Sequence, residues 1–111
     1  MDKQQWIDAS AVDEVPEDDV IGIVVGGRDI ALYNAGGEFH ATDNICTHGH
    51  ARLCEGFLEG HEIECPLHQG LFDIRTGAPR KAPCTVPVRT YPIRIVVGRV
   101  EVDVAGAEAL A

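Results

Sequence analysis

Two short motifs that pair a cysteine with a histidine constrain this chain more than any other feature of its sequence. The first is Cys46-Thr47-His48, and the second is Cys65-Pro66-Leu67-His68. Thiolates and imidazoles are metal ligands, and one pair from each of two segments supplies a set of four. The sequence therefore predicts a metal site that is built from two loops and has Cys46, His48, Cys65 and His68 as its ligands.

Two kinds of metal centre accept this mixture of sulfur and nitrogen. Zinc binds two sulfurs and two nitrogens, but its ligands are usually separated by at least two residues, whereas only Thr47 separates Cys46 from His48. In a Rieske-type [2Fe–2S] centre the cysteines bind one iron and the histidines the other. The cysteine and histidine of one motif therefore bind different irons, which fits their close spacing. Histidine ligation also raises the reduction potential, into a range of about −150 to +300 mV. We favour the iron–sulfur centre and keep structural zinc as the alternative.

The run CTHGHARLCEGFLEGHEIECPLHQGLFDIRTGAP, which contains both motifs, resembles the cluster-binding segment of Rieske ferredoxins. It is similar above all to the ferredoxin components of bacterial aromatic-ring-hydroxylating dioxygenases of the naphthalene and salicylate type. The likeness extends from Trp6 to about Val104 and is densest between Asp43 and Pro83. It implies an electron carrier, not an enzyme, that takes electrons from a flavin ferredoxin reductase and passes them to a terminal oxygenase. It also implies that the cysteines hold the buried iron and the histidines the outer one.

A second function is open to a chain with this cluster. It could be the permanently bound Rieske small subunit of another oxidoreductase, of the nitrite or arsenite type. Such a subunit should bury a sizeable apolar surface in its complex. The 5% aromatic content and the net charge of −9 favour the mobile carrier.

Composition limits the remaining possibilities. A chain of 111 residues is one domain, too short to hold a catalytic domain beside the cluster. Its 18 acidic and 9 basic side chains argue against binding to nucleic acid or to an anionic membrane surface. There is neither a run of roughly 18 apolar residues nor a secretory signal pattern. We therefore expect a cytoplasmic protein that is soluble and monomeric.

The hydrophobic pattern predicts an all-β fold. Alternating or β-branched segments separated by turn residues occur at 6–9, 20–25, 28–33, 38–42, 89–97 and 99–104. Gly26-Gly27 predicts a tight hairpin and Asn34-Ala35-Gly36-Gly37 a second turn. Residues 49–55 could form one helical turn, and we expect no long helix.

The family resemblance implies more about the architecture than the pattern does. It implies an antiparallel sandwich or barrel-like base, from about 1–42 and 84–104, with an inserted cluster-binding subdomain at about 43–83 and a short tail at 105–111. Pro79, Pro83 and Pro87 would form a stiff loop over the open side of the cluster.

Several other side chains have simple expected roles. Cys54 and Cys84 are expected to be small, buried and unreactive, with a disulfide between them as the alternative. His40 and His61 are expected to be solvated, and His50 to be a loop residue close to the cluster. Asp73 and Arg75 could form a salt bridge that supports the second loop.

The resemblance also predicts where the potential lies. In the high-potential relatives of respiratory cytochrome complexes, cysteines that tie the two loops together stand at the positions of Ala51 and Leu67. A serine and a tyrosine that donate to cluster sulfurs stand at those of Gly70 and Phe72. This chain lacks all four groups, so we expect a potential at the low end of the range and expect Gly70→Ser and Phe72→Tyr each to raise it.

Overall fold

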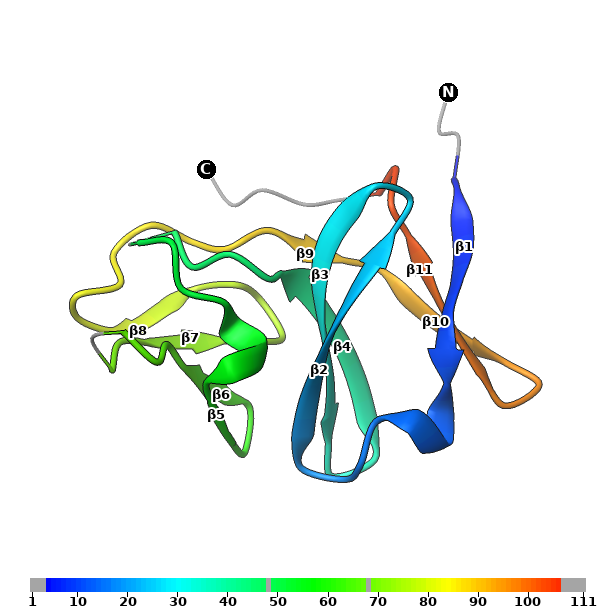
Figure 1. Cartoon of the computed structure of the whole chain (residues 1–111), viewed down its shortest axis with the longest axis horizontal. Helices are drawn as coiled ribbons and strands as arrows, with labels where there is room; N and C mark the ends of the chain where they lie inside the picture. The colour runs from blue at the N-terminus through cyan, green and yellow to red at the C-terminus, as the bar shows by residue number, and fades with distance from the viewer. Residues whose placement is uncertain (1–3, 48, 68, 107–111) are drawn as a thin grey trace.

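The computed structural model describes residues 4–47, 49–67 and 69–106. Over these residues the chain forms eleven strands in three antiparallel sheets and two short 3-10 turns (Figure 1). The all-β prediction is confirmed. Within this part of the chain, no helix has the length and apolar character needed to cross a membrane.

The central sheet has the strand order β2-β3-β4-β9. Its strands are Asp19–Val25, Arg28–Ala35, Glu38–Asp43 and Thr90–Tyr91. Gly26 and Gly27, with φ of 57° and 78°, form the predicted turn between β2 and β3. Two successive residues with positive φ match the right-handed twist of the paired strands, and glycine adopts this conformation at little cost.

The second sheet brings the two ends of the chain together. Its order is β1-β11-β10, with bounds Trp6–Ala11, Arg99–Asp103 and Ile93–Val96. Trp6 pairs with Asp103 and Ala11 with Arg99. The strand expected to run to Val97 ends at Val96, because Val97 and Gly98 form the turn into β11.

The third sheet consists of short strands that the hydrophobic pattern did not indicate. Its order is β5-β6-β7-β8, with bounds Phe57–Glu59, Glu62–Glu64, Leu71–Asp73 and Pro79–Lys81. The expected loop role of Pro79 is wrong, since this residue begins β8 and pairs with Phe72. An edge strand tolerates proline at its first position, because its outward side needs no N–H donor.

Alternate side chains of β3 face two different cores, which explains why this strand is buried on both faces. The loop-side core contains Val20, Ala31, Tyr33, Ala35, Cys46, Leu53, Ile63, Cys65, Phe72, Ile74, Cys84 and Val88. The basal core contains Val15, Val25, Ile30, Leu32, Ala41, Tyr91, Val100, Val102 and Val104. The central sheet thus lies between the β1-β11-β10 sheet and the small sheet that carries the second motif (Figure 1).

Candidate metal centre

Backbone pairing closes the first predicted ligand loop at its base. The loop follows β4, and Ile45 and Arg52 form an isolated antiparallel bridge across it. The Cys46 N–H donates to the Ala51 carbonyl over 2.9 Å. These backbone bonds hold Cys46 at the base of the loop.

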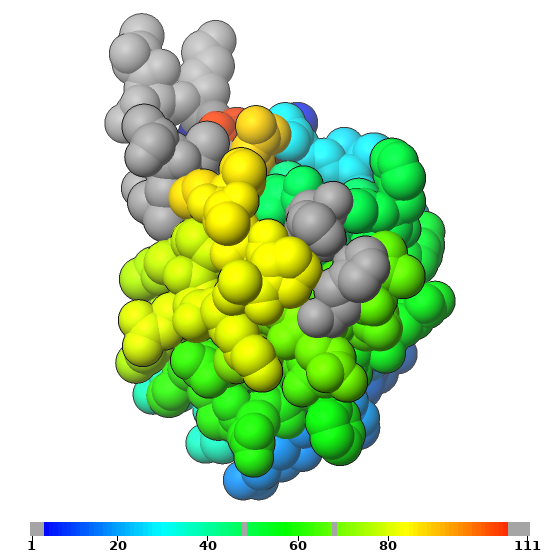
Figure 2. Space-filling view, turned by 90° about the vertical axis from the view of Figure 1, so that its left-hand side faces the viewer, coloured from blue at the N-terminus to red at the C-terminus, as the bar shows by residue number. Residues whose placement is uncertain are grey.

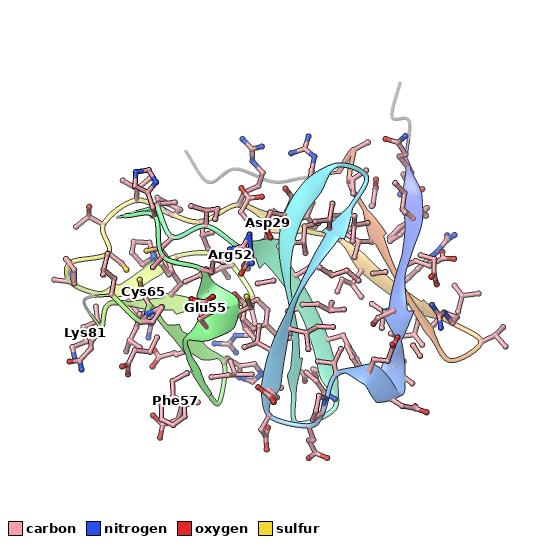
Figure 3. The ribbon with its side chains drawn as sticks, viewed as in Figure 1. Asp29, Arg52, Glu55, Phe57, Cys65 and Lys81 are labelled. Carbon is pink, nitrogen blue, oxygen red and sulfur yellow. The ribbon has the colours of Figure 1, made fainter. Side chains whose placement is uncertain are left out.

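Asn44, which is fully buried, attaches this loop to the central sheet. Its side-chain amide donates to an Asp29 carboxylate oxygen at 3.0 Å, and its side-chain carbonyl accepts from the Cys54 N–H at 2.9 Å. The other carboxylate oxygen of Asp29 accepts from Arg52 at 2.9 Å, and Figure 3 shows these two side chains pointing toward each other. One carboxylate at the start of β3 thus holds both ends of the loop.

The second loop has the same closure. Cys65 comes directly after β6, and its N–H donates to the Gly70 carbonyl over 2.8 Å. The Gln69 N–H in turn donates to the Cys65 carbonyl at 3.0 Å. In both loops, then, the cysteine N–H bonds to the carbonyl of the residue five positions later.

The two predicted histidine ligands, His48 and His68, lie outside the described residues. Their sequence neighbours do meet. A Cβ placed on Gly49 of the first loop would lie 3.1 Å from the Leu67 Cδ2 of the second. The structure therefore brings the two loops into contact next to the positions of both histidines.

The two predicted cysteine ligands lie in the loop-side core, and each is only 2% exposed. None of the chain's four cysteines takes part in a disulfide, so the alternative of a bond between Cys54 and Cys84 is wrong. Cys54 instead lies against Gly22 of β2 and accepts a hydrogen bond from Asn44. Cys84 is a member of the loop-side core and lies beside Gly70.

Cys84 is a member of the site that the sequence did not reveal. Burial is the main reason that the pKa of its thiol rises to about 12, and the neighbouring sulfurs of Cys46 and Cys65 add to the effect. All three cysteines pack in the loop-side core. The sequence signal for this position is the absence of a side chain at Gly70, because a Cβ there would lie only 2.4 Å from the Cys84 sulfur.

The segment after β8 covers part of the first loop. The Thr47 hydroxyl donates to the Val86 carbonyl at 2.6 Å, and the Val88 N–H donates to the Gly77 carbonyl at 2.9 Å. In Figure 2 this segment, drawn in yellow, lies against the green loop residues at the end of the molecule that faces the viewer. Pro83 and Pro87 belong to this segment, next to Cys84 and Val86.

The predicted salt bridge between Asp73 and Arg75 forms with two parallel contacts, at 3.1 and 3.0 Å. The pKa of the Asp73 carboxyl is lowered, first by the side-chain hydrogen bonds from Arg75. The same residue accepts the Gly77 N–H on its backbone carbonyl at 2.7 Å. The pair therefore braces the turn between β7 and β8, and not the second loop itself.

His40 and His61, both expected to be solvated, meet Glu38 on the surface. The imidazole Nε2 atoms of His61 and His40 lie 3.2 and 3.5 Å from one carboxylate oxygen of Glu38. These two contacts lower the pKa of Glu38, with His61 the larger cause. The expectation that both histidines are simply solvated is wrong, since each contacts Glu38, and the His61 contact joins the β3–β4 hairpin to the turn between β5 and β6.

The described residues fit an iron–sulfur cluster. Two thiols that form no disulfide are buried together in the loop-side core, at the base of two loops that backbone hydrogen bonds close. Deprotonated thiols are the ligands that such clusters require. A third thiol, that of Cys84, packs in the same core.

Comparisons with known proteins identify the same cluster. Residues 5–92 match the Rieske [2Fe-2S] domain. The chain is 55% identical over 102 residues to the ferredoxin component of the naphthalene 1,2-dioxygenase system of Pseudomonas aeruginosa, with 92% of this chain and 98% of the relative covered.

Two solved structures extend the comparison to the fold. The ferredoxin of Sphingomonas yanoikuyae B1 is 40% identical, with a TM-score of 0.85, and the match covers 89% of this chain and 98% of that one. A chain from the complex of reduced oxygenase and oxidized ferredoxin in carbazole 1,9a-dioxygenase is 37% identical, with a TM-score of 0.87 and coverage of 98% and 100%.

The fold and the two buried thiols define a small β-sheet protein that carries one [2Fe–2S] cluster and transfers electrons. The chain belongs to the Rieske [2Fe–2S] domain family, and within it to the ferredoxin components of dioxygenase systems. The alternatives of a structural zinc module and of a bound small subunit are thereby disfavoured. Like these relatives, the chain is an electron-transfer component and not a catalytic enzyme.

Proposed function

We propose that this chain carries single electrons from a flavin-containing ferredoxin reductase to the terminal oxygenase of a system that hydroxylates aromatic rings. The observation that carries this proposal is the burial of Cys46 and Cys65 together beneath two loops that reach the surface. The names of the relatives, such as the naphthalene and anthranilate dioxygenase ferredoxins, support the choice of partner. We further propose that the chain acts as a soluble monomer in the cytoplasm.

We propose that Cys46 and Cys65 hold the inner iron and that His48 and His68 hold the outer one. The cluster, when bound, supplies a one-electron couple. The chain's own residues keep the ligands in place. The backbone closures of both loops and the Asn44 contacts limit how far the ligand atoms can move when the charge changes. Burial of the two sulfurs keeps water away from the inner side.

The ligand assignment can be tested with a matched set of histidine variants. His48→Ala and His68→Ala should abolish the visible absorption and the electron paramagnetic resonance signal of a Rieske cluster. His50→Ala is the control, because His50 is an exposed residue of the same loop. A normal Rieske signal in His68→Ala, or its loss in His50→Ala alone, would contradict the assignment.

Partner binding is proposed at the end of the molecule that carries both loops. Three apolar side chains there, Ile45, Leu67 and Val86, are 39%, 54% and 55% exposed. The net charge of −9 would steer a partner with a basic surface toward the chain. The rate of electron transfer from reductase to ferredoxin should then fall as salt is raised from about 0.01 to 0.15 M, where the screening length shortens from about 30 to 8 Å. A rate that is independent of salt would exclude steering by charge.

We propose that the chain divides into a base, at about 1–42 and 84–104, and a cluster-binding subdomain at about 43–83. The separate basal core supports this division. Because metal-binding energy is part of the folding energy of a metal site, removal of the cluster should expose the amides of 43–83 first. Hydrogen exchange before and after chelation tests this division. Equal loss of protection in the base would contradict it.

A further inference from the structure

A second group of metal-ligand side chains lies outside the two Cys/His motifs. It consists of Glu38, His40 and His61, whose ligand atoms all lie within 4.8 Å of one another. The side chains of His40 and His61 are 24% and 35% exposed, and that of Glu38 is 66% exposed. The group is therefore accessible to an ion from solvent, although protein covers most of both imidazoles.

We infer that Glu38, His40 and His61 form a surface site for a divalent transition-metal ion such as Zn²⁺. Such a site would be separate from the cluster, because none of the three residues belongs to either Cys/His motif. It would also be independent of the electron-transfer function proposed above.

The backbone brings the three side chains together from two parts of the fold. Glu38 and His40 are two residues apart in β4, so their side chains lie on the same face of this strand. His61 lies in the two-residue turn between β5 and β6, and its carbonyl accepts the Ile74 N–H at 2.9 Å. In Figure 1 the β3–β4 turn and the β5–β6 turn both lie along the lower side of the molecule. Strand pairing and the Ile74 bond thus hold the backbone of all three residues.

The distances between the ligand atoms suit a metal ion. Zn²⁺ binds imidazole nitrogen and carboxylate oxygen at about 2.0–2.2 Å in tetrahedral directions, so two such ligands lie about 3.3–3.6 Å apart. The Nε2 atoms of His61 and His40 lie 3.2 and 3.5 Å from one carboxylate oxygen of Glu38, close to this separation. The two imidazole rings meet edge to face, with their centroids 6.1 Å apart. One ion between the three side chains would replace both hydrogen bonds.

The donor set selects the kind of ion. Two imidazoles and one carboxylate suit zinc, nickel and copper, whereas Mg²⁺ and Ca²⁺ prefer sites made of oxygen alone. Three protein ligands leave a fourth position to water. The net charge of −9 favours a cation. Arg75, whose charge acts on Glu38, is itself paired with Asp73.

A bound ion would join the two parts of the chain. Glu38 and His40 belong to the proposed base, and His61 belongs to the proposed cluster-binding subdomain. Strand β6 begins directly after His61 and ends directly before Cys65. The ion would therefore anchor the start of the strand that leads into the second ligand loop.

Isothermal titration of tag-free, cluster-loaded protein with zinc chloride tests the site. Zn²⁺ is the probe because it has no redox chemistry and leaves the oxidation state of the cluster unchanged. Wild type should bind one Zn²⁺ per chain and should give no heat of binding with magnesium chloride. His40→Ala, His61→Ala and Glu38→Gln should each weaken Zn²⁺ binding about tenfold or more, since even the loss of an outer-sphere partner costs about 10–100-fold.

Two variants serve as matched controls. His50→Ala and Glu55→Gln remove an exposed imidazole and an exposed carboxylate elsewhere in the chain, and both should bind Zn²⁺ like wild type. Wild type that binds no Zn²⁺, or ligand variants that bind it as tightly as the controls, would overturn the inference. The Rieske signal is recorded on the same samples. A normal signal without Zn²⁺ binding would therefore overturn the metal site and leave the proposed function intact.

X-ray absorption at the zinc edge needs no variant to fold. Zinc-loaded wild type should show nitrogen and oxygen ligands at about 2.0–2.2 Å. A sulfur ligand at about 2.3 Å would mean that Zn²⁺ has entered the cysteine site, and it would overturn the inference.

Hydrogen exchange of the Ile74 amide tests whether the ion anchors the turn between β5 and β6. This amide bonds to the His61 carbonyl, so its exchange should slow when Zn²⁺ is added to wild type and should not change in His61→Ala. Local exchange is preferable to thermal unfolding here, because the thiols of the unfolded chain would also bind Zn²⁺. Unchanged exchange in zinc-loaded wild type would overturn the inference that the ion holds this turn against the β3–β4 hairpin.

Discussion

The Thr47 hydroxyl donates a 2.6 Å hydrogen bond to the Val86 carbonyl. This bond joins the first ligand loop to the segment after β8, which is otherwise attached to the turn between β7 and β8 through Val88 and Gly77. Thr47 stands between two predicted ligands, Cys46 and His48. The contact therefore connects the segment after β8 directly to the backbone of the first ligand loop.

Thr47→Val should keep the shape of this side chain and remove the hydrogen bond. We expect the cluster to be lost to a chelator about fivefold faster. The missing hydrogen bond contributes about 1 kcal/mol to keeping the segment after β8 against the first loop. The decay of visible absorption measures this rate. Thr85→Val is the control, since Thr85 is exposed and its side chain makes no hydrogen bond with the described residues. Equal rates in both variants would mean that the Thr47 contact does not restrain the segment.

Asp73→Asn should weaken the turn between β7 and β8. Because the folded-state pKa of Asp73 is lowered, its ion pair with Arg75 contributes stability above the unfolded-state pKa, about 3.9. This contribution is lost as the pH falls through the folded-state value. At pH 7 we expect a loss of about 1 kcal/mol, since the Arg75 side chain is half exposed and solvent screens the pair.

Urea unfolding of the cluster-loaded protein at pH 7 and below pH 4 measures this effect. The stability difference between wild type and Asp73→Asn should shrink as the pH falls below about 3.9, because the unfolded-state carboxyl takes up a proton first and the folded-state one at still lower pH. Glu62→Gln is the control, because Glu62 forms a pair with Arg80 in which both side chains are well exposed. A difference that stays constant with pH would assign the loss to packing and not to the charge of Asp73.

The sequence predicted the larger strands because each is bounded by a strong local signal. Gly26-Gly27 and Gly36-Gly37 adopt positive φ in the structure, and the turns they form set the register of β2, β3 and β4. Strands β5 to β8 have three residues each, which is too short for an alternating pattern to be recognised. Their pairing depends on tertiary contacts.

The sequence predicted those residues of the candidate site that belong to its two Cys/His motifs. Cys46 and Cys65 came from local spacing, and the structure buries them together. The roles of Asn44 and Cys84 could not be predicted in this way, because their partners are distant in sequence. Asn44 donates a hydrogen bond to Asp29 of β3, and Cys84 packs beside Gly70, which has no side chain.

Val97 is a strained residue in a hairpin turn. It has a φ of 48° in the turn between β10 and β11, and its side chain is 96% exposed. A β-branched residue rarely adopts this left-handed conformation, which costs roughly 1–2 kcal/mol, whereas asparagine tolerates it in two-residue hairpin turns. Val97→Asn should therefore raise the free energy of unfolding by about 1 kcal/mol.

Thermal unfolding measures this gain, and the midpoint potential should not change. Val24→Asn is the control, since Val24 is also well exposed but lies within β2, where asparagine is unfavourable. An unchanged or lower unfolding temperature for Val97→Asn would show that the turn is not strained at this position.

The potential of the wild-type cluster should lie near the low end of the Rieske range, at roughly −150 mV. Phe72, fully buried in the same core as Cys46 and Cys65, supplies no hydrogen-bond donor to a cluster sulfur. Phe72→Tyr should raise the potential by about 40–60 mV if its hydroxyl donates to a cluster sulfur, since about 1–1.5 kcal/mol then favours the reduced state. Phe39→Tyr is the control, because Phe39 packs against the basal core. Voltammetry that places the wild type well above 0 mV, or that finds the same potential in both tyrosine variants, would contradict this account of what sets the potential.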